Sequence, residues 1–157
     1  MDVEPARVRK ALAYITRRDD LLVFRHKDFP LAEVGVQVPA GTVREGEAIQ
    51  EAAVREAVEE TGVQDLTLVR FLGSVDYDVR PERSEVHERH FFHFQAPDDT
   101  ADEWLWHEAH DGLHAPTAFL FWWLPLVKGH VLAAGMGARL AAIERAVASR
   151  NTWRTRS

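Results

Sequence analysis

The chain is organised around Gly41-Thr-Val-Arg-Glu-Gly-Glu47-Ala-Ile-Gln-Glu-Ala-Ala-Val-Arg55-Glu56-Ala-Val-Glu59-Glu60-Thr-Gly62-Val63. This stretch begins with a glycine loop after Pro39 and continues into a helix. We expect the helix to end at Gly62, because glycine tolerates the left-handed backbone conformation of a helix C-cap. We expect a poor N-cap, since Gly46 and Ala48 have no side-chain oxygen to offer the free N–H groups.

Three carboxylates crowd one side of this helix. Glu56 and Glu60 are four residues apart and share a face, and Glu59 lies alongside them. Their charges repel one another, and Arg55 is the one cation at their border within the helix. A divalent cation would relieve the repulsion, and hard oxygen ligands of this kind suit Mg²⁺ or Mn²⁺. A glutamate-rich face is also typical of a solvated helix, so the helix by itself does not establish a metal site.

The spacing around these carboxylates makes the pattern specific. Residues 41–63 of the 157 resemble the Nudix box, with apolar Ala57 and Val63 in its two variable hydrophobic positions. The fixed positions of the box are all filled, by Gly41, Glu47, Arg55, Glu56, Glu59, Glu60 and Gly62. This resemblance implies an α/β protein with the Nudix fold, an α/β/α sandwich around a mixed β-sheet. Periodicity alone would predict only a mixture of helices and strands.

The resemblance also implies an activity, the metal-dependent hydrolysis of the pyrophosphate bond in a nucleoside diphosphate linked to another group. It assigns Glu59 and Glu60 as the principal metal ligands and Glu56 as a further ligand or the general base. The backbone carbonyl of Ala40 would be another ligand, and Arg55 would orient the carboxylates. The cofactor implied is Mg²⁺ or Mn²⁺.

The resemblance also implies that the general base can lie outside the box, later in the chain. Glu103 and Glu108 lie at suitable distances along the chain, and we take Glu103 as the candidate for catalysis. Glu85 and Glu88 are alternatives. Each of the four is as easily an ordinary surface carboxylate.

Substrate contacts are expected from basic and aromatic side chains. The candidates for phosphate binding are Arg25, Arg44 and Arg89, although most surface arginines are simply solvated. Trp104 is the candidate for stacking on a base, a contact worth about 1–3 kcal/mol. The competing reading places the tryptophans in the hydrophobic core.

The substrate stays open between several classes: ADP-ribose, nucleotide sugars, dinucleoside polyphosphates and nucleoside triphosphates. The alternative to an enzyme is a catalytically silent nucleotide-binding or regulatory module of the same fold. Such modules usually lose glutamates of the box, and none is lost here. An RNA-directed role is a third reading, and the acidic charge gives it no support.

Length and composition bound these readings. The chain has 157 residues, 46% of them hydrophobic, which suits a single domain that we place at residues 1–150, followed by a flexible tail at 151–157. A net charge of −6 argues against a general nucleic-acid binder. The chain contains no cysteine, no signal-like segment at its start and no apolar run that could span a membrane, so we expect a cytoplasmic protein. Whether it forms a homodimer stays open.

Hydrophobic patterning predicts the remaining elements. Alternating apolar residues indicate strands at 7–16, 21–26, 35–38, 66–79, 86–95, 103–108 and 119–127. The first two strands should form a hairpin. Apolar residues at helical spacing predict a second long helix at 130–150.

Overall fold

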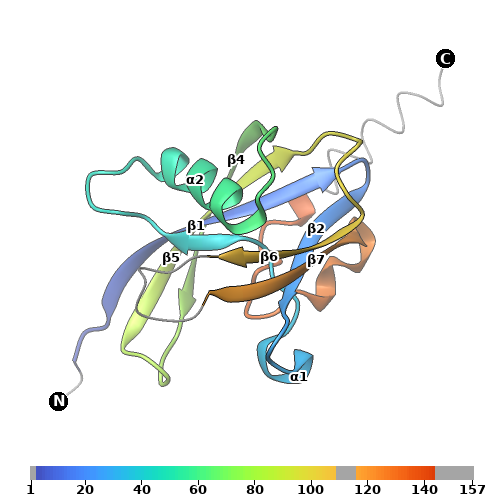
Figure 1. Ribbon diagram of the computed structural model, residues 1–157. Coiled ribbons are helices and arrows are strands. Elements are labelled where there is room, and N and C mark those ends of the chain that lie inside the picture. The colour runs from blue at the N-terminus through green and yellow to red at the C-terminus, as the bar shows by residue number, and fades with distance from the viewer. Residues whose placement is uncertain (1–2, 109–115, 144–157) are drawn as a thin grey trace.

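The structure, a computed structural model, describes residues 3–108 and 116–143 (Figure 1). Its strands are β1 (Ala6–Arg17), β2 (Asp20–His26), β3 (Ala40–Thr42), β4 (Thr67–Asp78), β5 (Glu85–Gln95), β6 (Glu103–Glu108) and β7 (Thr117–Pro125). Its helices are α1 (Leu31–Val34), α2 (Ile49–Thr61) and the 3-10 helix η1 (Leu126–Val131).

One mixed sheet contains all seven strands. Their order is β4-β5-β1-β2-β7-β6, and the short β3 pairs with the middle of β1. The β1–β5 pair is parallel and the other pairs are antiparallel. β1 and β2 form the predicted hairpin, in which Arg17 pairs with Asp20. The mixed sheet predicted for this chain is confirmed.

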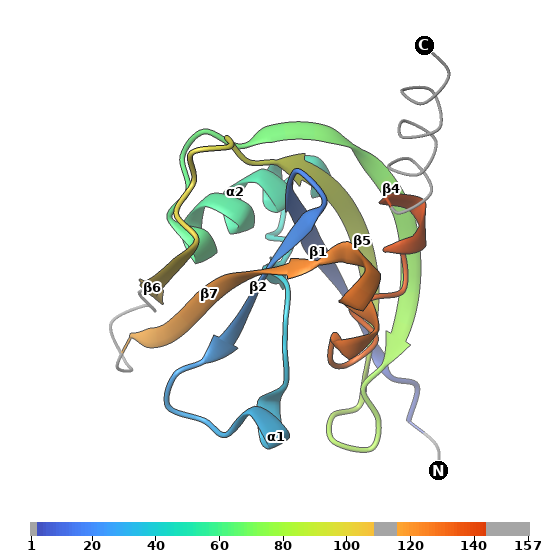
Figure 2. The same cartoon turned by 90° about the vertical axis from the view of Figure 1, so that its right-hand side faces the viewer.

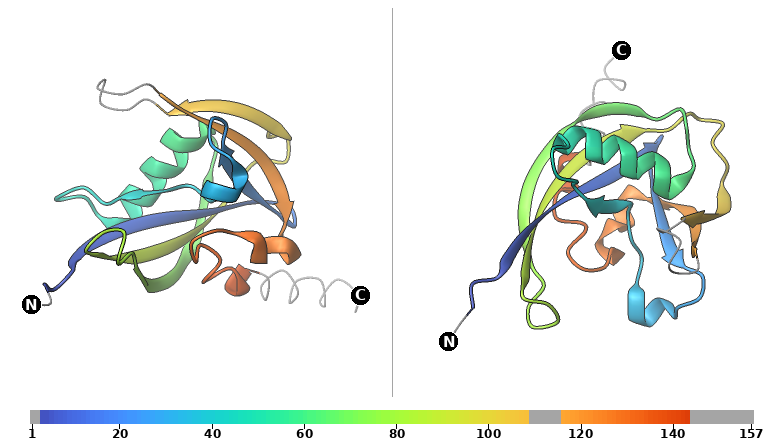
Figure 3. Two further views of the ribbon diagram at one scale, coloured as in Figure 1. Left: turned by 90° about the horizontal axis from the view of Figure 1, so that it is seen from below. Right: turned by 60° about the vertical axis from the view of Figure 1, so that its left-hand side comes forward.

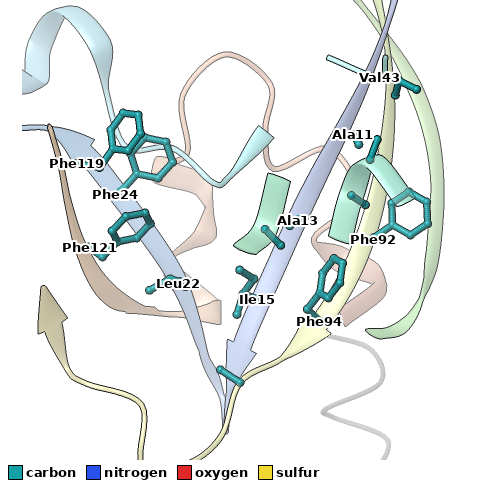
Figure 4. Packing of buried hydrophobic residues seen from close by; sticks show 14 residues of the cluster. Ala11, Ala13, Ile15, Leu22, Phe24, Val43, Phe92, Phe94, Phe119 and Phe121 are labelled. Atoms are coloured by element: carbon teal, nitrogen blue, oxygen red, sulfur yellow. The ribbon is translucent and has the colours of Figure 1, made fainter. Parts of the chain in front are cut away.

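Each face of the sheet buries its own core. On one face the fully buried apolar side chains of α2 are small, Ala52, Ala53 and Ala57, so the helix lies close against the strands, and Ile49 packs at its first turn. Phenylalanines of β2, β5 and β7 fill the rest of this core (Figure 4). The opposite face is covered by the segment 126–143, through Leu126, Leu140 and Ile143 among others (Figure 2). The predicted arrangement, a mixed sheet between two covering layers, is confirmed.

The ends of α2 follow the sequence prediction. Ala48 occupies the N-cap and makes no side-chain cap hydrogen bond. Gly62 caps the other end with φ 78°, the left-handed conformation expected of it. Its N–H donates to the carbonyl of Val58.

Two predicted elements differ in the structure. The helix expected at 130–150 is wrong up to Leu140: η1 ends at Val131, and turns follow. Gly135, at φ 69°, places these turns against Tyr77 and Arg89, a contact that the apolar spacing does not reveal. Residues 144–150 and the predicted tail at 151–157 lie outside the described residues.

The strand predicted at 35–38 is the second difference. Only isolated bridges join Val36 to Leu132 and Gln37 to Phe24, and the regular strand begins at Ala40, inside the box. Pro39 lacks an N–H donor, which favours an interruption here. Within the described residues, no helix is long and apolar enough to cross a membrane.

Candidate functional site

Backbone groups along β3 alternate between pointing toward β1 and pointing away from it, and the outward groups form one side of the site. The carbonyl of Pro39 accepts from β1 and the N–H of Val43 donates to β1. Since the bonding direction alternates along an antiparallel strand, Ala40 and Thr42 direct their backbone groups away from β1. Figure 3 shows β3 running beside α2, so these groups face the helix that carries the carboxylates.

Side chains of α2 meet those outward backbone groups. The Ala40 N–H donates to a carboxylate oxygen of Glu60 at 2.8 Å, and the Thr42 carbonyl accepts from Arg55 at 3.1 Å. The Ala40 carbonyl points to the same side as its N–H, because both groups of one strand residue face the same way. The free edge of β3 is thereby hydrogen-bonded to the side chains of α2, and the Ala40 carbonyl is directed toward the glutamates.

Arg55 lies among the carboxylates of the box. Its guanidinium binds both oxygens of Glu47, at 2.8 and 2.9 Å, in a bidentate pair. It also donates to Glu56 at 2.6 Å and approaches Glu59 at 3.3 Å. The sequence analysis places Arg55 at the border of the cluster and expects it to orient the carboxylates; its side chain contacts three of the box glutamates.

Gly41 makes room for Glu56. A Cβ atom at position 41 would overlap the Glu56 carboxylate. The glycine is therefore required by the close approach of helix and loop.

Burial sets the acidity of these carboxylates. Burial raises the pKa of Glu60 well above its ordinary value, and the charges of Glu108, Glu56 and Glu59 raise it further. Burial also raises the pKa of Glu56, although Arg55 opposes that change. The bidentate pair with Arg55 lowers the pKa of Glu47 to about 2. The fold thus keeps two carboxylates in an environment that disfavours their charge.

The donor chemistry fits a divalent cation. Across residues 3–108 and 116–143, no three histidine or acidic side chains converge on one point as they stand. The guanidinium of Arg55 lies between Glu56 and Glu59, and Glu60 is turned to the Ala40 N–H. The three glutamates nevertheless offer hard oxygen donors, and a divalent cation would offset the buried charge of Glu56 and Glu60.

A cavity of about 190 Å³ opens beside Ala40 and Gly41, on the sheet face opposite α2. Lys10, His87 and Arg89 bring positive or ionisable groups to its wall. The guanidinium of Arg89 lies 3.9 Å over the ring of Tyr77 and donates to the Ala134 carbonyl. In the described part of the chain it forms no ion pair. The predicted substrate residue Arg89 therefore lines a pocket that adjoins the box.

Lys10 is a site residue that the sequence analysis missed. Its ammonium donates to the Thr42 hydroxyl at 2.6 Å, and burial lowers its pKa. In the parallel β1–β5 pair Lys10 is the direct partner of Arg89. The alternation of β1 indicates which face Lys10 occupies, but only the strand pairing places it beside Arg89.

The other predicted residues lie elsewhere. Arg25, Glu103 and Trp104 line a second cavity of about 380 Å³ between β2, β6 and β7. Glu103 and Glu108 begin and end β6, about 17 Å apart at 3.3–3.4 Å per residue. The negative charge of Glu108 helps to raise the pKa of Glu60, whereas the side chain of Glu103 is exposed. The structure brings Glu108 to the box carboxylates and does not bring Glu103 there.

Trp104 and Arg44 have partners within the protein. The ring of Trp104 stacks on Phe121, with centroids 5.1 Å apart, and its indole N–H donates to the Thr61 carbonyl. The backbone N–H of Arg44 donates to Glu47, in the loop that precedes α2. The exposed side chain of Arg44 adds positive charge near Glu47 and Glu56.

Comparison with known proteins agrees with this architecture. The NUDIX domain family model matches residues 6–138. A MutT protein from Methanosarcina mazei Go1 has a similar structure, with 21% identity and a TM-score of 0.61 over 92% of this chain and 97% of that one. A NUDIX hydrolase from Nitrosomonas europaea is 19% identical, with a TM-score of 0.62 over 88% of both chains.

A third similar structure is the Ap4A hydrolase of C. elegans, at 21% identity and a TM-score of 0.57 over 88% of this chain and 96% of that chain. At these identities the structural likeness shows a shared fold.

Proposed function

Because this chain belongs to the Nudix family of pyrophosphohydrolases, we propose that it is a metal-dependent enzyme that cleaves the pyrophosphate bond of a nucleoside diphosphate linked to another group. One observation carries the proposal. The carboxylates of α2 lie against β3 where the Ala40 backbone faces away from β1, so oxygen donors from two elements gather at one edge. Gly41 keeps that approach free of side chains.

Each residue of the edge has a proposed role. Glu59, Glu60 and the Ala40 carbonyl hold Mg²⁺ or Mn²⁺, and Glu56 is a further ligand. Arg55 orients the carboxylates through its pairs with Glu47 and Glu56. The bound cation would neutralise pyrophosphate charge and lower the pKa of a water molecule.

For the general base, Glu108 has more support than Glu103. The negative charge of Glu108 contributes to the raised pKa of Glu60, which supports a position for its carboxylate near the box. Glu103 shares a separate cavity with Arg25 and Trp104. A Glu108→Gln variant with normal turnover would return the role to Glu103 or to Glu56.

Substrate binding is proposed in the cavity beside Ala40. Arg89 and Lys10 supply donors there for phosphate or carbonyl oxygens of the substrate. Arg44, whose charge acts on Glu56, is proposed to contact a phosphate. Arg25 would serve a longer substrate that reaches the second cavity, whereas the ring of Trp104 is already engaged by Phe121.

The test is product analysis. The purified protein would be incubated with Mg²⁺ or Mn²⁺ and with ADP-ribose, nucleotide sugars, diadenosine polyphosphates and nucleoside triphosphates, with Glu60→Gln alongside. Release of a nucleoside monophosphate and a phosphorylated fragment by the wild type alone supports the proposal and identifies the substrate. If the wild type binds metal and nucleotide but cleaves none of them, the silent binding module becomes the better explanation.

We propose a cytoplasmic setting for this activity, since a chain without cysteine needs no oxidising compartment. The net charge of −6 makes a small nucleotide a better partner than a nucleic acid. Light scattering would distinguish a monomer from a homodimer.

A further inference from the structure

The last turn of α2 rests on two tryptophans of β6. The indole N–H of Trp106 donates to the Glu59 carbonyl at 2.8 Å, and that of Trp104 donates to the Thr61 carbonyl at 2.9 Å. The final carbonyls of a helix have no partner within the helix. Side chains of another strand satisfy two of them here, and they do so in the turn that carries Glu59 and Glu60. Figure 2 shows β6 beside this end of α2.

The contact between β6 and the helix end is close. A Cβ atom at Gly62 would lie 2.6–2.8 Å from three ring atoms of Trp106. Gly62 therefore serves two needs, since it adopts the left-handed C-cap at φ 78° and it admits the indole ring beneath the cap. A residue with a side chain would be strained at this φ and would also overlap the Trp106 ring.

The two donors are themselves held in place. β6 directs Trp104 and Trp106 to the α2 face, because alternate residues of a strand share a face. Trp104 stacks on Phe121 with an interplanar angle of 14°, and both indoles pack against the core under α2. On the other side of the same turn, the Ala40 N–H holds the Glu60 carboxylate. The turn is thus fixed between β6 and β3.

We propose that Trp104 and Trp106 are positioning residues for metal binding. Through the Glu59 and Thr61 carbonyls they fix the height and rotation of the last turn, and so the directions in which the Glu59 and Glu60 side chains leave the helix. This inference rests on the proposed function, in which those glutamates hold the cation. Loss of either indole N–H would loosen the turn while the aromatic core stays filled.

Trp123 provides a matched control. Its indole N–H also donates to a backbone carbonyl, that of Ala101 at 2.9 Å, and its ring packs against the same core. Its bond holds the loop before β6 instead of α2. Substitution by phenylalanine removes one N–H donor at each of the three positions and keeps an aromatic ring.

The experiment compares wild type, Trp104→Phe, Trp106→Phe and Trp123→Phe. Mn²⁺ affinity is measured by electron paramagnetic resonance in the absence of substrate, and amide hydrogen exchange of peptides from α2 is measured in the metal-free protein. We expect Trp106→Phe and Trp104→Phe to weaken Mn²⁺ binding about tenfold, the lower end of what partners behind metal ligands contribute. Exchange near residues 58–62 should rise in both variants, and excess Mn²⁺ should restore most of their turnover.

Trp123→Phe should bind Mn²⁺ within twofold of wild type. A merely structural role would lower thermal stability in all three variants and leave Mn²⁺ affinity unchanged, and that result would overturn the inference. If wild-type protein binds no Mn²⁺, the proposed function fails separately. In that case hydrogen exchange alone tests whether the indoles hold the turn. Unchanged exchange in Trp104→Phe and Trp106→Phe would show that they do not.

Discussion

Gly41 lies against the carboxylate of Glu56, so closely that any side chain at position 41 would occupy the space of that carboxylate. The constraint is one of volume, since Gly41 does not adopt a backbone conformation reserved for glycine. Glu56 is buried beside β3 and held by Arg55. The first glycine of the box is thus explained by the side chain fifteen positions later in the sequence.

Gly41→Ala should therefore displace Glu56 and reduce turnover by about 100-fold, because a shift of roughly 1 Å in a catalytic array has that effect. Gly46→Ala is the control, since Gly46 has open space around it but a φ of 77°. Strain at Gly46 should cost about 1 kcal/mol and leave turnover unchanged. Initial rates and thermal midpoints measured on both variants test this contrast, which equal activity losses would contradict.

The buried carboxylate of Glu60 should make the metal-free protein sensitive to pH. Its pKa is higher in the fold than the ordinary 4.5, so the fold binds this proton more tightly than the unfolded chain does. The stability that this proton contributes is therefore fully present below pH 4.5 and is lost as pH rises from 4.5 through the folded-state pKa. Each tenfold weakening of the acid by burial corresponds to about 1.4 kcal/mol.

Glu60→Gln should consequently be more stable than wild type at pH 8 in EDTA, and the difference should vanish near pH 4.5. The glutamine oxygen can still accept from the Ala40 N–H. Urea midpoints across this range provide the measurement. Mg²⁺ should stabilise wild type and leave Glu60→Gln unchanged, and a Mg²⁺ response in the variant would argue against Glu60 as a ligand.

Glu47 should respond to acid in the opposite sense. Its pairing with Arg55 lowers the folded-state pKa to about 2, from an ordinary value of 4.5. The stability from this pair is fully present above pH 4.5 and is lost as pH falls toward 2. Glu47→Gln should lack that loss, so its urea midpoint should change less than that of wild type between pH 5 and 2.5. Arg55→Lys keeps the positive charge but cannot form the bidentate pair with Glu47, so its urea midpoint should also change less with pH, as in Glu47→Gln.

Much of the site follows from the sequence because the box is local. Helix geometry places Glu56, Glu59 and Glu60 together, and the C-cap at Gly62 needs only its own backbone conformation. Contacts between distant strands are a different matter. Strand alternation puts Glu103 and Glu108 on opposite faces of β6, but only the packing of that strand against α2 shows that the face of Glu108 is the one turned to the box.

The segment after β7 fails as a helix prediction for a similar reason. Its apolar spacing suits a helix, but the segment folds back on itself where Gly129 meets Leu140, and Gly135 contacts Tyr77 and Arg89 of the sheet. Gly135 packs on Tyr77, which lies far earlier in the sequence. Tertiary contact overrides the local pattern here.

Arg89 supplies the last prediction, because it carries a charge that no carboxylate of the described residues pairs with. Burial lowers its pKa, yet an arginine stays charged at neutral pH. If it binds the substrate, Arg89→Met should raise KM by roughly 10- to 100-fold, the loss expected for a hydrogen bond to a charged group. Turnover at saturation and Mn²⁺ affinity should hardly change.

Arg80→Met is the control, because it removes an exposed arginine paired with Asp78 and should leave KM unaltered. Steady-state kinetics on both variants decide the matter, and a wild-type KM in Arg89→Met would remove Arg89 from the substrate site.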